Sequence, residues 1–295
     1  MKLITQPEAG IGPVIQAIRR AQRAIHICIF RLDRPEIEKA LAAAVQRGVL
    51  VRALIAHTNR GGQPGLRKLE KRLLDAGLTV TRTADELLRY HAKFLVADDV
   101  LHVFGFNLTK IDTLKSRSFG LATRDKRTVQ EAIKLFEADV TRNAYMPSRS
   151  NLVVSPETAR TMLTTFLKGT RKDLSIYDEK IQDPVMVKLL KELAASGVRV
   201  RVLGNLKGPD GEVAVRSLKT MRLHVRAIVR DGTRAFVGSQ SLRKVELDQR
   251  REVGLLINNP TVTRSLLKVF DADWEASATK VERKEEKKQE QAAVA

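Results

Sequence analysis

The sequence predicts an α/β protein made of two duplicated lobes, each with a mixed, mainly parallel sheet flanked by helices. The first observation behind this prediction is a short motif that occurs twice. Residues 91–98 read His-Ala-Lys-Phe-Leu-Val-Ala-Asp, and residues 224–231 read His-Val-Arg-Ala-Ile-Val-Arg-Asp. Seven residues after its Asp, each copy is followed by a glycine, Gly105 or Gly238. The second observation is a helix with flanking strands, which also occurs twice.

The apolar centre of each motif predicts a buried strand. Phe-Leu-Val in the first copy and Ala-Ile-Val in the second are rich in β-branched or aromatic residues, as buried strands are. Side chains alternate between the faces of a strand, so His91 and Lys93 are expected on one side, and so are His224 and Arg226. An imidazole serves as a nucleophile or acid near neutral pH, and a cation beside it attracts phosphate. A core histidine beside a lysine that reaches to water is the plain alternative, and the recurrence of the pattern favours catalysis.

A helix with the same punctuation is predicted in each half. Pro35 and Pro184 stand in its first turn, and Gly48 and Gly197 follow its end, as is typical of helices. Both pairs are 149 residues apart (184 − 35 and 197 − 48). Helical crossovers between strands favour parallel pairing. The strands predicted around the two helices are 24–30, 49–55, 173–177 and 198–203.

The first half carries an insertion. The two motifs are only 133 residues apart (224 − 91), so the first half holds 16 more residues (149 − 133) between these landmarks. Much of the excess is placed in 57–90, which contains a glycine-rich loop and a basic helix over 66–76. With the joint at 143–150, the predicted parts are an N-terminal lobe at 1–147, a C-terminal lobe at 148–276, and a charged, disordered tail at 277–295.

The chain is strongly basic. Its 295 residues include 53 Lys and Arg and 34 Asp and Glu, for a net charge of +19. This surplus attracts polyanions, either nucleic acid or an anionic membrane surface, although basic helix faces also serve solubility alone. Aromatic residues make up only 4% of the chain, which argues mildly against a stacking platform for single-stranded nucleic acid. The best candidates for a substrate-facing basic patch are Arg67, Lys68, Lys71 and Arg72, in the insertion.

Length, hydropathy and cysteine content predict a globular protein without an anchor. A chain of this length can bury a good core, and no stretch approaches the roughly 20 apolar residues that span a bilayer. We therefore expect a cytoplasmic protein that is at most peripheral at an anionic membrane. The single cysteine, Cys28, excludes a disulfide within the chain, and its place in a predicted core strand makes it an unreactive thiol.

These residues resemble the phospholipase D superfamily, whose mark is H-x-K-x4-D-x6-G-S-x-N present twice. The resemblance extends from about residue 8 to Trp274 and is closest in the second half, where Gly238-Ser239-Gln240-Ser241 follows the motif. It implies phospholipase D-like lobes with a single site at the lobe interface, to which each lobe contributes one motif. One chain then holds both half-sites, so a monomer suffices for chemistry.

The resemblance also implies a two-step mechanism that needs no metal or other cofactor. His91 is the implied nucleophile, which forms a phosphohistidine. His224 is the implied acid, which protonates the leaving alcohol and then activates water or an acceptor alcohol. The residues implied to hold the phosphoryl oxygens are Lys93, Arg226, Asn107 and Ser239.

Both motifs depart from the family pattern. Arg226 stands for the usual Lys, which keeps the charge but changes the geometry. Ser241 stands where Asn is expected. In the first copy Asn107 directly follows Gly105-Phe, so it fits the pattern only with a one-residue gap, as though a Ser had been deleted.

The acidic residues near the motifs are expected to differ in role. Glu252 matches a family carboxylate that orients the nearby imidazole, as carboxylates do for catalytic histidines. Its counterpart in the first lobe is Ser118, so the proposed nucleophile His91 is expected to lack an orienting acid. Asp98 and Asp231 are expected to hold the turn after each motif strand.

Three functions follow from this reading. The leading one is a phosphodiesterase that acts on phospholipid, by hydrolysis or by phosphatidyl transfer to an alcohol. The second is a nuclease, which the basic charge favours. The third is a polyanion-binding protein that keeps the fold with weakened catalysis, for which the missing Ser and the substituted Ser118 are the evidence.

Overall fold

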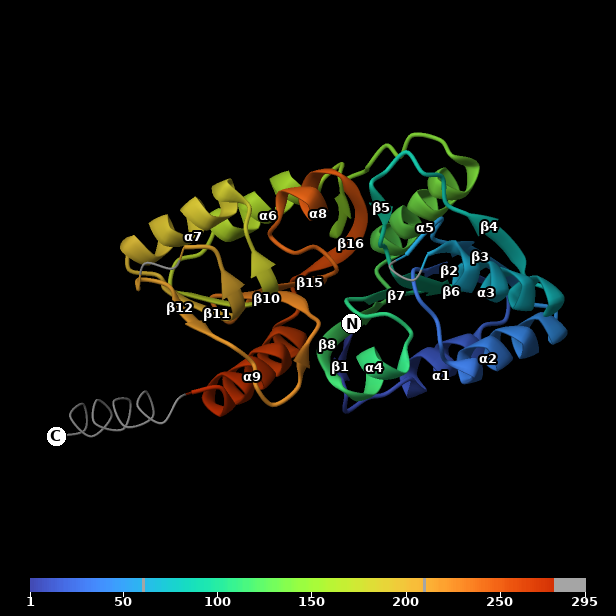
Figure 1. Cartoon of the computed structure of the whole chain (residues 1–295), viewed down its shortest axis with the longest axis horizontal. Coiled ribbons are helices and arrows are strands. Elements are labelled where there is room, and N and C mark those ends of the chain that lie inside the picture. Colours follow the sequence, from blue (N-terminus) through green and yellow to red (C-terminus); the bar gives the residue numbers. More distant parts are fainter. Residues whose placement is uncertain (60–61, 209–210, 279–295) are drawn as a thin grey trace.

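The structure is a computed structural model that describes residues 1–59, 62–208 and 211–278. Two lobes lie side by side along the long axis of the molecule (Figure 1). The N lobe contains the elements from β1 to α5, and the C lobe contains those from β9 to α9. Each lobe has one large sheet with helices on both faces, so the prediction of duplicated α/β lobes is confirmed.

The two sheets have the same arrangement of strands. The N-lobe sheet runs in the order β1 (Lys2–Gln6), β8 (Ser116–Thr123), β7 (Val100–Phe104), β6 (Phe94–Ala97), β2 (Ala24–Ile29), β3 (Leu50–Ile55) and β4 (Thr79–Arg82). The C-lobe sheet runs in the order β12 (Ala214–Arg216), β11 (Arg199–Leu206), β10 (Asp173–Ile181), β14 (Arg226–Arg230), β15 (Arg234–Gly238), β16 (Arg250–Ile257) and β9 (Leu152–Ser155).

The sheets are mixed as predicted, but the prediction that they are mainly parallel is wrong. Among the strands named above, the parallel pairs are β2–β3 and β3–β4 in the N lobe and β10–β11 and β11–β12 in the C lobe. The motif strands β6 and β14 instead form antiparallel ladders with the strands on both of their sides. Tight turns after each motif strand allow antiparallel neighbours, so antiparallel pairs outnumber parallel ones.

Helices pack on both faces of each sheet and bury three apolar cores. The outer N-lobe face carries α1 (Gly12–Arg20), α2 (Pro35–Gln46) and α3 (Gln63–Asp75), and the outer C-lobe face carries α6 (Ala159–Lys168), α7 (Pro184–Ala195) and the short α8 (Lys244–Asp248). The third core is shared by both lobes and includes side chains of α5 (Lys126–Thr141) and α9 (Pro260–Ala276). The predicted helix punctuation is confirmed, since Gly48 and Gly197 follow α2 and α7 with φ of 83° and 89°.

Equivalent pairs of residues show how closely the two lobes correspond. β1 pairs with β8 so that Gln6 faces Ser118, and β9 pairs with β16 so that Ser155 faces Glu252. Gln6 and Ser155 are 149 residues apart (155 − 6), and Ser118 and Glu252 are 134 residues apart (252 − 118). The offset of 149 therefore relates residues before the insertion to their counterparts in the C lobe, and the offset of 134 relates residues after the turn that follows the motif strand.

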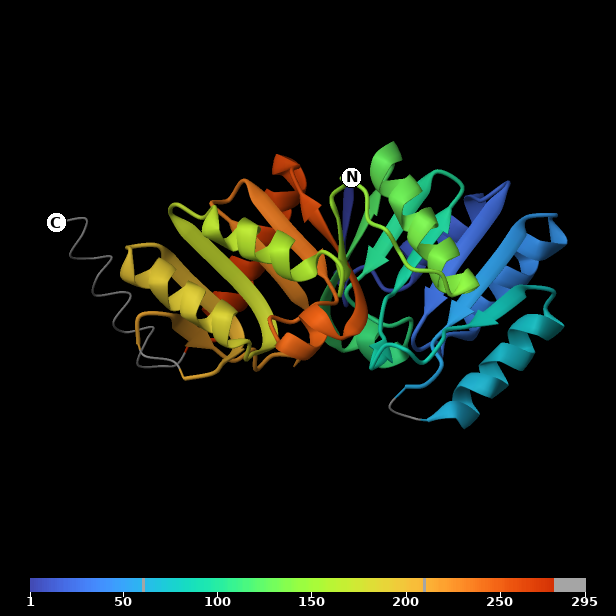
Figure 2. The same cartoon turned by 90° about the horizontal axis from the view of Figure 1, so that it is seen from above.

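The lobes also exchange short strands. β5 (Arg89–Tyr90) belongs to the N lobe but pairs with β16 of the C lobe, while β13 (Arg222–Leu223) of the C lobe pairs with β8 of the N lobe. The short helices α4 (Lys110–Leu114) and α8 lie where the lobes meet, as both Figure 1 and the view from above in Figure 2 show.

The insertion predicted in the first half is α3, which has no helical counterpart between β11 and β12 in the described residues of the C lobe. Part of the glycine-rich loop before α3 and most of the predicted tail, from residue 279, lie outside the described residues. The lobe boundary near residue 147 stays a prediction. Within the described ranges, no helix combines the length and apolar character needed to cross a bilayer.

Candidate active site

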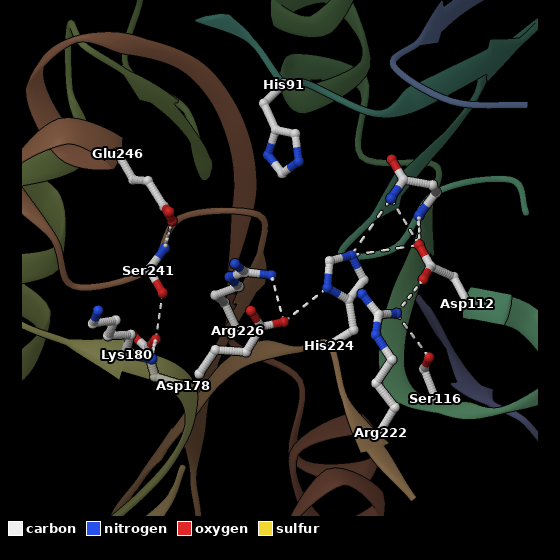
Figure 3. A network of polar contacts seen from close by, with 12 residues as sticks. His91, Asp112, Ser116, Asp178, Lys180, Arg222, His224, Arg226, Ser241 and Glu246 are labelled. Atoms are coloured by element: carbon white, nitrogen blue, oxygen red, sulfur yellow. Dashed lines mark hydrogen bonds and ion pairs between the residues drawn. The ribbon is translucent and has the colours of Figure 1, made fainter. Parts of the chain in front are cut away.

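The exchanged strands carry both motif histidines to the interface. The backbone N–H of His91 donates to the carbonyl of Arg251 at 2.8 Å, and that of His224 donates to the carbonyl of Arg117 at 3.1 Å. Each histidine is therefore fixed by the opposite lobe. In Figure 3 the rings of His91 and His224 point into the same region, with Arg226 beside it.

A carboxylate from the C lobe orients His91. Its ring Nδ1 lies 2.7 Å from Oε2 of Glu252, which is fully buried on β16. The edge of the ring packs against Phe30, with ring centroids 4.6 Å apart. The expectation that His91 lacks an orienting acid is thus wrong, because the acid crosses the lobe interface instead of coming from the same lobe.

His224 is oriented by different residues. Its Nδ1 lies 2.8 Å from Oε1 of Glu179, at the end of β10, and its Nε2 lies 3.4 Å from Oδ2 of Asp112 on α4. Neither carboxylate was predicted from the sequence. Glu179 could have been found by the helix-repeat offset, since it is the counterpart of Phe30 (179 − 30 = 149), beside His91.

Ser118 explains this asymmetry. It occupies the position equivalent to Glu252, and among the described residues its buried hydroxyl has no hydrogen-bond partner. A serine side chain is too short to replace a glutamate that reaches across the interface. His224 therefore receives its carboxylate from within its own lobe, while the equivalent position beside His91 holds Phe30.

Two cations border the histidines. The Lys93 ammonium donates to the carbonyl oxygen of His91 at 2.8 Å and lies 3.1 Å from both nitrogens of that ring. The Arg226 guanidinium lies 3.5 Å from Oε1 of Glu179. Both cations are buried, so an anion that enters this space would interact with them in a medium that screens charge weakly.

Burial and the two cations keep His91 neutral. Burial and the charges of Lys93, Arg226 and His224 hold the pKa of His91 well below its ordinary value. Burial also lowers the pKa of Lys93 to about 8 and raises the pKa of Glu252. A carboxylate only accepts hydrogen bonds, so a neutral His91 paired with an ionised Glu252 donates from Nδ1 and leaves the lone pair on Nε2.

The carboxylates around His224 favour its protonated form. Burial lowers the pKa of His224, but the hydrogen bond to Glu179 and the charge of Asp112 oppose this shift. Burial alone would raise the pKa of Glu179, yet His224 and Arg226 outweigh it and hold this pKa at about 2. The pKa of both imidazoles lies below its ordinary value, and that of His91 is lowered further; such a difference in surroundings suits a division into base and acid.

The residues after the motifs occupy equivalent places with different contacts. The backbone N–H of Asn107 donates to Asp112, and that of Ser241 donates to Glu246. The side-chain amide of Asn107 lies 3.5 Å from Nε2 of His224. The Ser241 hydroxyl instead donates to Asp178, a buried carboxyl whose pKa burial raises to about 6. Asn107 therefore borders the histidine, whereas Ser241 belongs to a neighbouring network.

The one-residue gap lies in the turn after the motif strand and not at the expected missing Ser. Two residues separate β6 from β7, whereas three separate β14 from β15. Gly105 N–H donates to the carbonyl of Phe119, and Ser239 N–H donates to that of Val253, 134 residues further on (253 − 119). Gly105 therefore stands at the position of Ser239, and Gly238 is the counterpart of Phe104. The Ser239 hydroxyl bonds the backbone of Val253 and also interacts with the Glu252 carboxylate, whose pKa it lowers against the effect of burial.

Asp98 and Asp231 hold the turns after the motif strands. Both have φ of 52°, and their carboxylates accept backbone N–H groups of residues 22–24 and 171–173, respectively. These contacts lie at the far end of each motif strand from the histidines. The two aspartates anchor the strand that follows the first helix of each lobe and do not contact the site.

The basic candidates on α3 are only partly available to a substrate. The Arg72 guanidinium makes two hydrogen bonds to Glu38 on α2, at 2.8 and 3.0 Å. Arg67 bonds Gln63 within α3. Lys68 and Lys71 are exposed. Among the residues that the structure describes, no group of three or more His, Cys, Asp or Glu could hold a metal ion.

Two equivalent half-sites at the interface of duplicated lobes define a member of the phospholipase D superfamily. Residues 14–140 and 163–274 match the family model described as cardiolipin synthase, PLD-like domain, and the chain belongs to this family. No curated protein matches the chain significantly.

Solved structures with a similar fold include two enzymes. Polyphosphate kinase from Porphyromonas gingivalis has a TM-score of 0.79 and 19% identity over 93% of this chain, which spans 47% of that enzyme. Phosphatidylserine synthase from Haemophilus influenzae Rd KW20 has a TM-score of 0.70 and 13% identity, over 94% of this chain and 86% of that one. At these identities the similarity concerns the fold.

Proposed function

We propose that this protein is a phospholipase D-type phosphodiesterase that cleaves or transfers phospholipid phosphodiesters through a phosphohistidine. The observation that carries the proposal is the pair of imidazoles at one interface, each with Nδ1 on a carboxylate and each next to a buried cation. The description of its family names a synthase of a phospholipid, which favours a lipid substrate.

In the first step, Nε2 of neutral His91 attacks phosphorus. A P–N bond forms while the bond to the leaving alcohol breaks. His224 donates its proton to the departing oxygen, which prevents an alkoxide from forming. Lys93 and Arg226 stabilise the negative charge that develops on the phosphoryl oxygens, and Glu252 stabilises the charge that His91 gains.

In the second step, His224 acts as a base. It takes a proton from water or an acceptor alcohol, whose oxygen attacks phosphorus and displaces His91. Water gives hydrolysis, and an alcohol gives transfer. The amide of Asn107, near Nε2 of His224, is our candidate for holding the incoming or leaving oxygen.

The third alternative, a polyanion-binding protein with weakened catalysis, rests on the missing Ser of the first motif and on Ser118 in place of an orienting acid. In the structure, the Glu252 carboxylate lies beside Nδ1 of His91, and the Glu179 carboxylate lies beside Nδ1 of His224. This removes the main reason to favour a protein that only binds polyanions. The nuclease remains a second candidate because the net charge of +19 suits a nucleic-acid substrate equally well,.

The experiment that tests the proposal offers purified protein phosphatidylcholine and phosphatidylglycerol with labelled headgroups and, in parallel, plasmid and single-stranded DNA. Release or transfer of a headgroup supports the proposal, DNA cleavage alone would replace it with the nuclease, and binding without turnover would contradict both. His91→Ala and His224→Ala should each lower turnover at least about a hundredfold.

The phosphohistidine can be trapped with a lipid labelled on phosphorus. Brief reaction followed by denaturation in base should leave an acid-labile label on the wild-type chain, mapped to His91. A label on His224 would reverse the assigned roles. A label that survives on the His91→Ala variant would exclude His91 as the nucleophile.

A further inference from the structure

A cavity of about 690 Å³ lies in the N lobe, apart from the motif histidines and cations. It lies between α1 and the ends of β1, β7 and β8, next to the turn after β6, and opens to the surface. That turn is at the opposite end of β6 from His91 and Lys93, and neither residue lines the cavity. Its volume falls within the range of about 300–1,000 Å³ that is typical of small-molecule sites.

The C lobe fills the equivalent space with large apolar side chains. Ala17 of α1 corresponds to the buried Phe166 of α6 (166 − 17 = 149), and Ala122 of β8 corresponds to Leu256 of β16 (256 − 122 = 134). Phe166 belongs to the outer core of the C lobe, and the partly buried Leu256 packs against this core. The buried residues of α1 before and after Ala17 are large, and so are their counterparts in α6. We therefore infer that α1 packs over its sheet as α6 does, and that the cavity results from the small side chains of Ala17 and Ala122.

One wall of the cavity is an unusual polar residue. His102 on β7 faces Ala122 across the β7–β8 ladder, and its counterpart in the other lobe is Phe236 (236 − 102 = 134), which faces Leu256. His102 is 7% exposed, and its Nδ1 has no hydrogen-bond partner among the described residues. Burial lowers the pKa of His102 to about 4, so the ring is neutral near pH 7. An unpaired buried polar group is costly, and a phenylalanine would avoid that cost.

Cations surround the opening of the cavity. Lys2 faces Ala122 from β1, so Lys2, Ala122 and His102 form one row across three neighbouring strands. Exposed Arg20, at the end of α1, and Arg124, after β8, also line the cavity. Arg124 pairs with Asp99 at the surface, and the Asp98 carboxylate is occupied by backbone N–H groups. The rim therefore carries excess positive charge over an interior of small apolar side chains.

We propose that this cavity binds a single-chain anionic amphiphile, with its alkyl chain between α1 and the sheet and its carboxylate or phosphate head near Arg20, Lys2 and His102. The alkyl chain takes the place that Phe166 and Leu256 occupy in the other lobe. The head accepts hydrogen bonds from the cations and from the imidazole N–H of His102. This site is separate from the proposed chemistry of the two motifs.

The test measures binding of dodecanoate and dodecyl phosphate to the full chain by calorimetry, below the concentrations at which they form micelles. We expect one molecule of either anion to bind per chain. Dodecanol lacks the charge and inorganic phosphate lacks the tail, so each should bind at least about tenfold more weakly. His91→Ala should bind as the wild type does, which separates this site from the active site.

Substitutions copied from the C lobe locate the site. Ala17→Phe should abolish binding by filling the cavity while the chain stays folded, and Ala122→Leu provides a second filling variant. His102→Phe and Arg20→Gln should each weaken binding about tenfold. Arg234→Gln, the same charge change at an exposed position of the C lobe, is the matched control and should have no effect.

Three results would overturn the proposal. The first is that neither anion binds the wild-type chain. The second is that dodecanol binds as tightly as dodecanoate, which would leave the cations without a role. The third is that folded Ala17→Phe and Ala122→Leu variants bind both anions as the wild type does, which would place the amphiphile elsewhere.

Discussion

At the residue scale, the two histidines differ in how their carboxylates reach them. Glu252 approaches His91 from the opposite lobe and is fully buried, whereas Glu179 approaches His224 from its own lobe and is 35% exposed in its side chain. Ser118 marks the place where a symmetric partner of Glu252 would stand. This difference leads to separate predictions for the two acids.

Glu252→Gln should lower turnover by about a thousandfold, with little change in KM. The amide keeps the shape of the side chain but can present its N–H₂ to Nδ1, which favours the wrong tautomer of His91, as it does in other carboxylate–histidine pairs. The measurement is steady-state hydrolysis of bis(p-nitrophenyl) phosphate. Ser118→Ala, at the equivalent position, is the matched control and should keep near-normal turnover; equal losses in both variants would contradict the role of Glu252.

Glu179→Gln should move the alkaline limb of the pH profile of kcat/KM to lower pH. The Glu179 carboxylate raises the pKa of His224, and an acid catalyst loses activity as pH rises through its pKa. Removal of the carboxylate lowers that pKa, so activity is lost earlier as pH increases. An unchanged alkaline limb, or a shift confined to the acidic limb, would show that His224 is not the acid.

Local patterns could not predict these pairings. His91 and Glu252 are 161 residues apart in the chain, and the sequence linked Glu252 only to the nearer histidine of its own lobe. The identity of both motif histidines and both cations was accessible, because the same spacing occurs twice. Glu179 and Asp112 lie outside the repeated motif, so no local pattern distinguished them from other carboxylates.

At the element scale, helix and strand positions followed from proline and glycine punctuation and from apolar runs. The predicted strands at 24–30 and 49–55 correspond to β2 and β3, and Pro35 begins α2. The proportion of parallel strand pairs could not be predicted from the sequence, because it depends on which strand lies beside β2. The motif strand β6 takes that place in an antiparallel orientation. A one-residue difference in the following turn also misaligned Gly105 with Gly238.

Gly105→Ala should destabilise the protein by about 1–3 kcal/mol. A Cβ at this position would lie 2.9 Å from the carbonyl oxygen of Gly238 and 3.0 Å from that of Phe119, and backbone atoms cannot move aside as a flexible side chain can. The measurement is the free energy of unfolding in urea. Gly65→Ala on α3, where a Cβ meets no atom within 4 Å, is the control and should be neutral or slightly stabilising; similar losses in both variants would contradict the argument.

At the scale of the whole molecule, the lobes share one core. The buried cluster that contains Phe94 and Phe136 of the N lobe also contains Tyr177, Phe270 and Trp274 of the C lobe. The exchange of β5 and β13 adds backbone hydrogen bonds across the same interface. We infer that neither lobe keeps its packing when the other unfolds.

The chain should therefore unfold in a single transition despite its two lobes. Trp274, the one tryptophan, reports on the C lobe, while circular dichroism at 222 nm reports on the helices of both. We expect the two guanidinium unfolding curves to coincide. Separate midpoints, with part of the helical signal lost before or after the change in Trp274 fluorescence, would contradict a shared core.

The correspondence between the lobes has a consequence for how the two histidines can differ. In a dimer of identical chains, a substitution appears on both sides of the symmetry axis at once, so Ser118 could not stand opposite Glu252. A fused pair of half-sites escapes this constraint, and each half can change alone. Two differences between the lobes depend on this freedom. Phe30 is the counterpart of Glu179, and the cavity beside Ala17 and Ala122 is the counterpart of a filled space in the C lobe. A dimer of identical chains could hold neither difference.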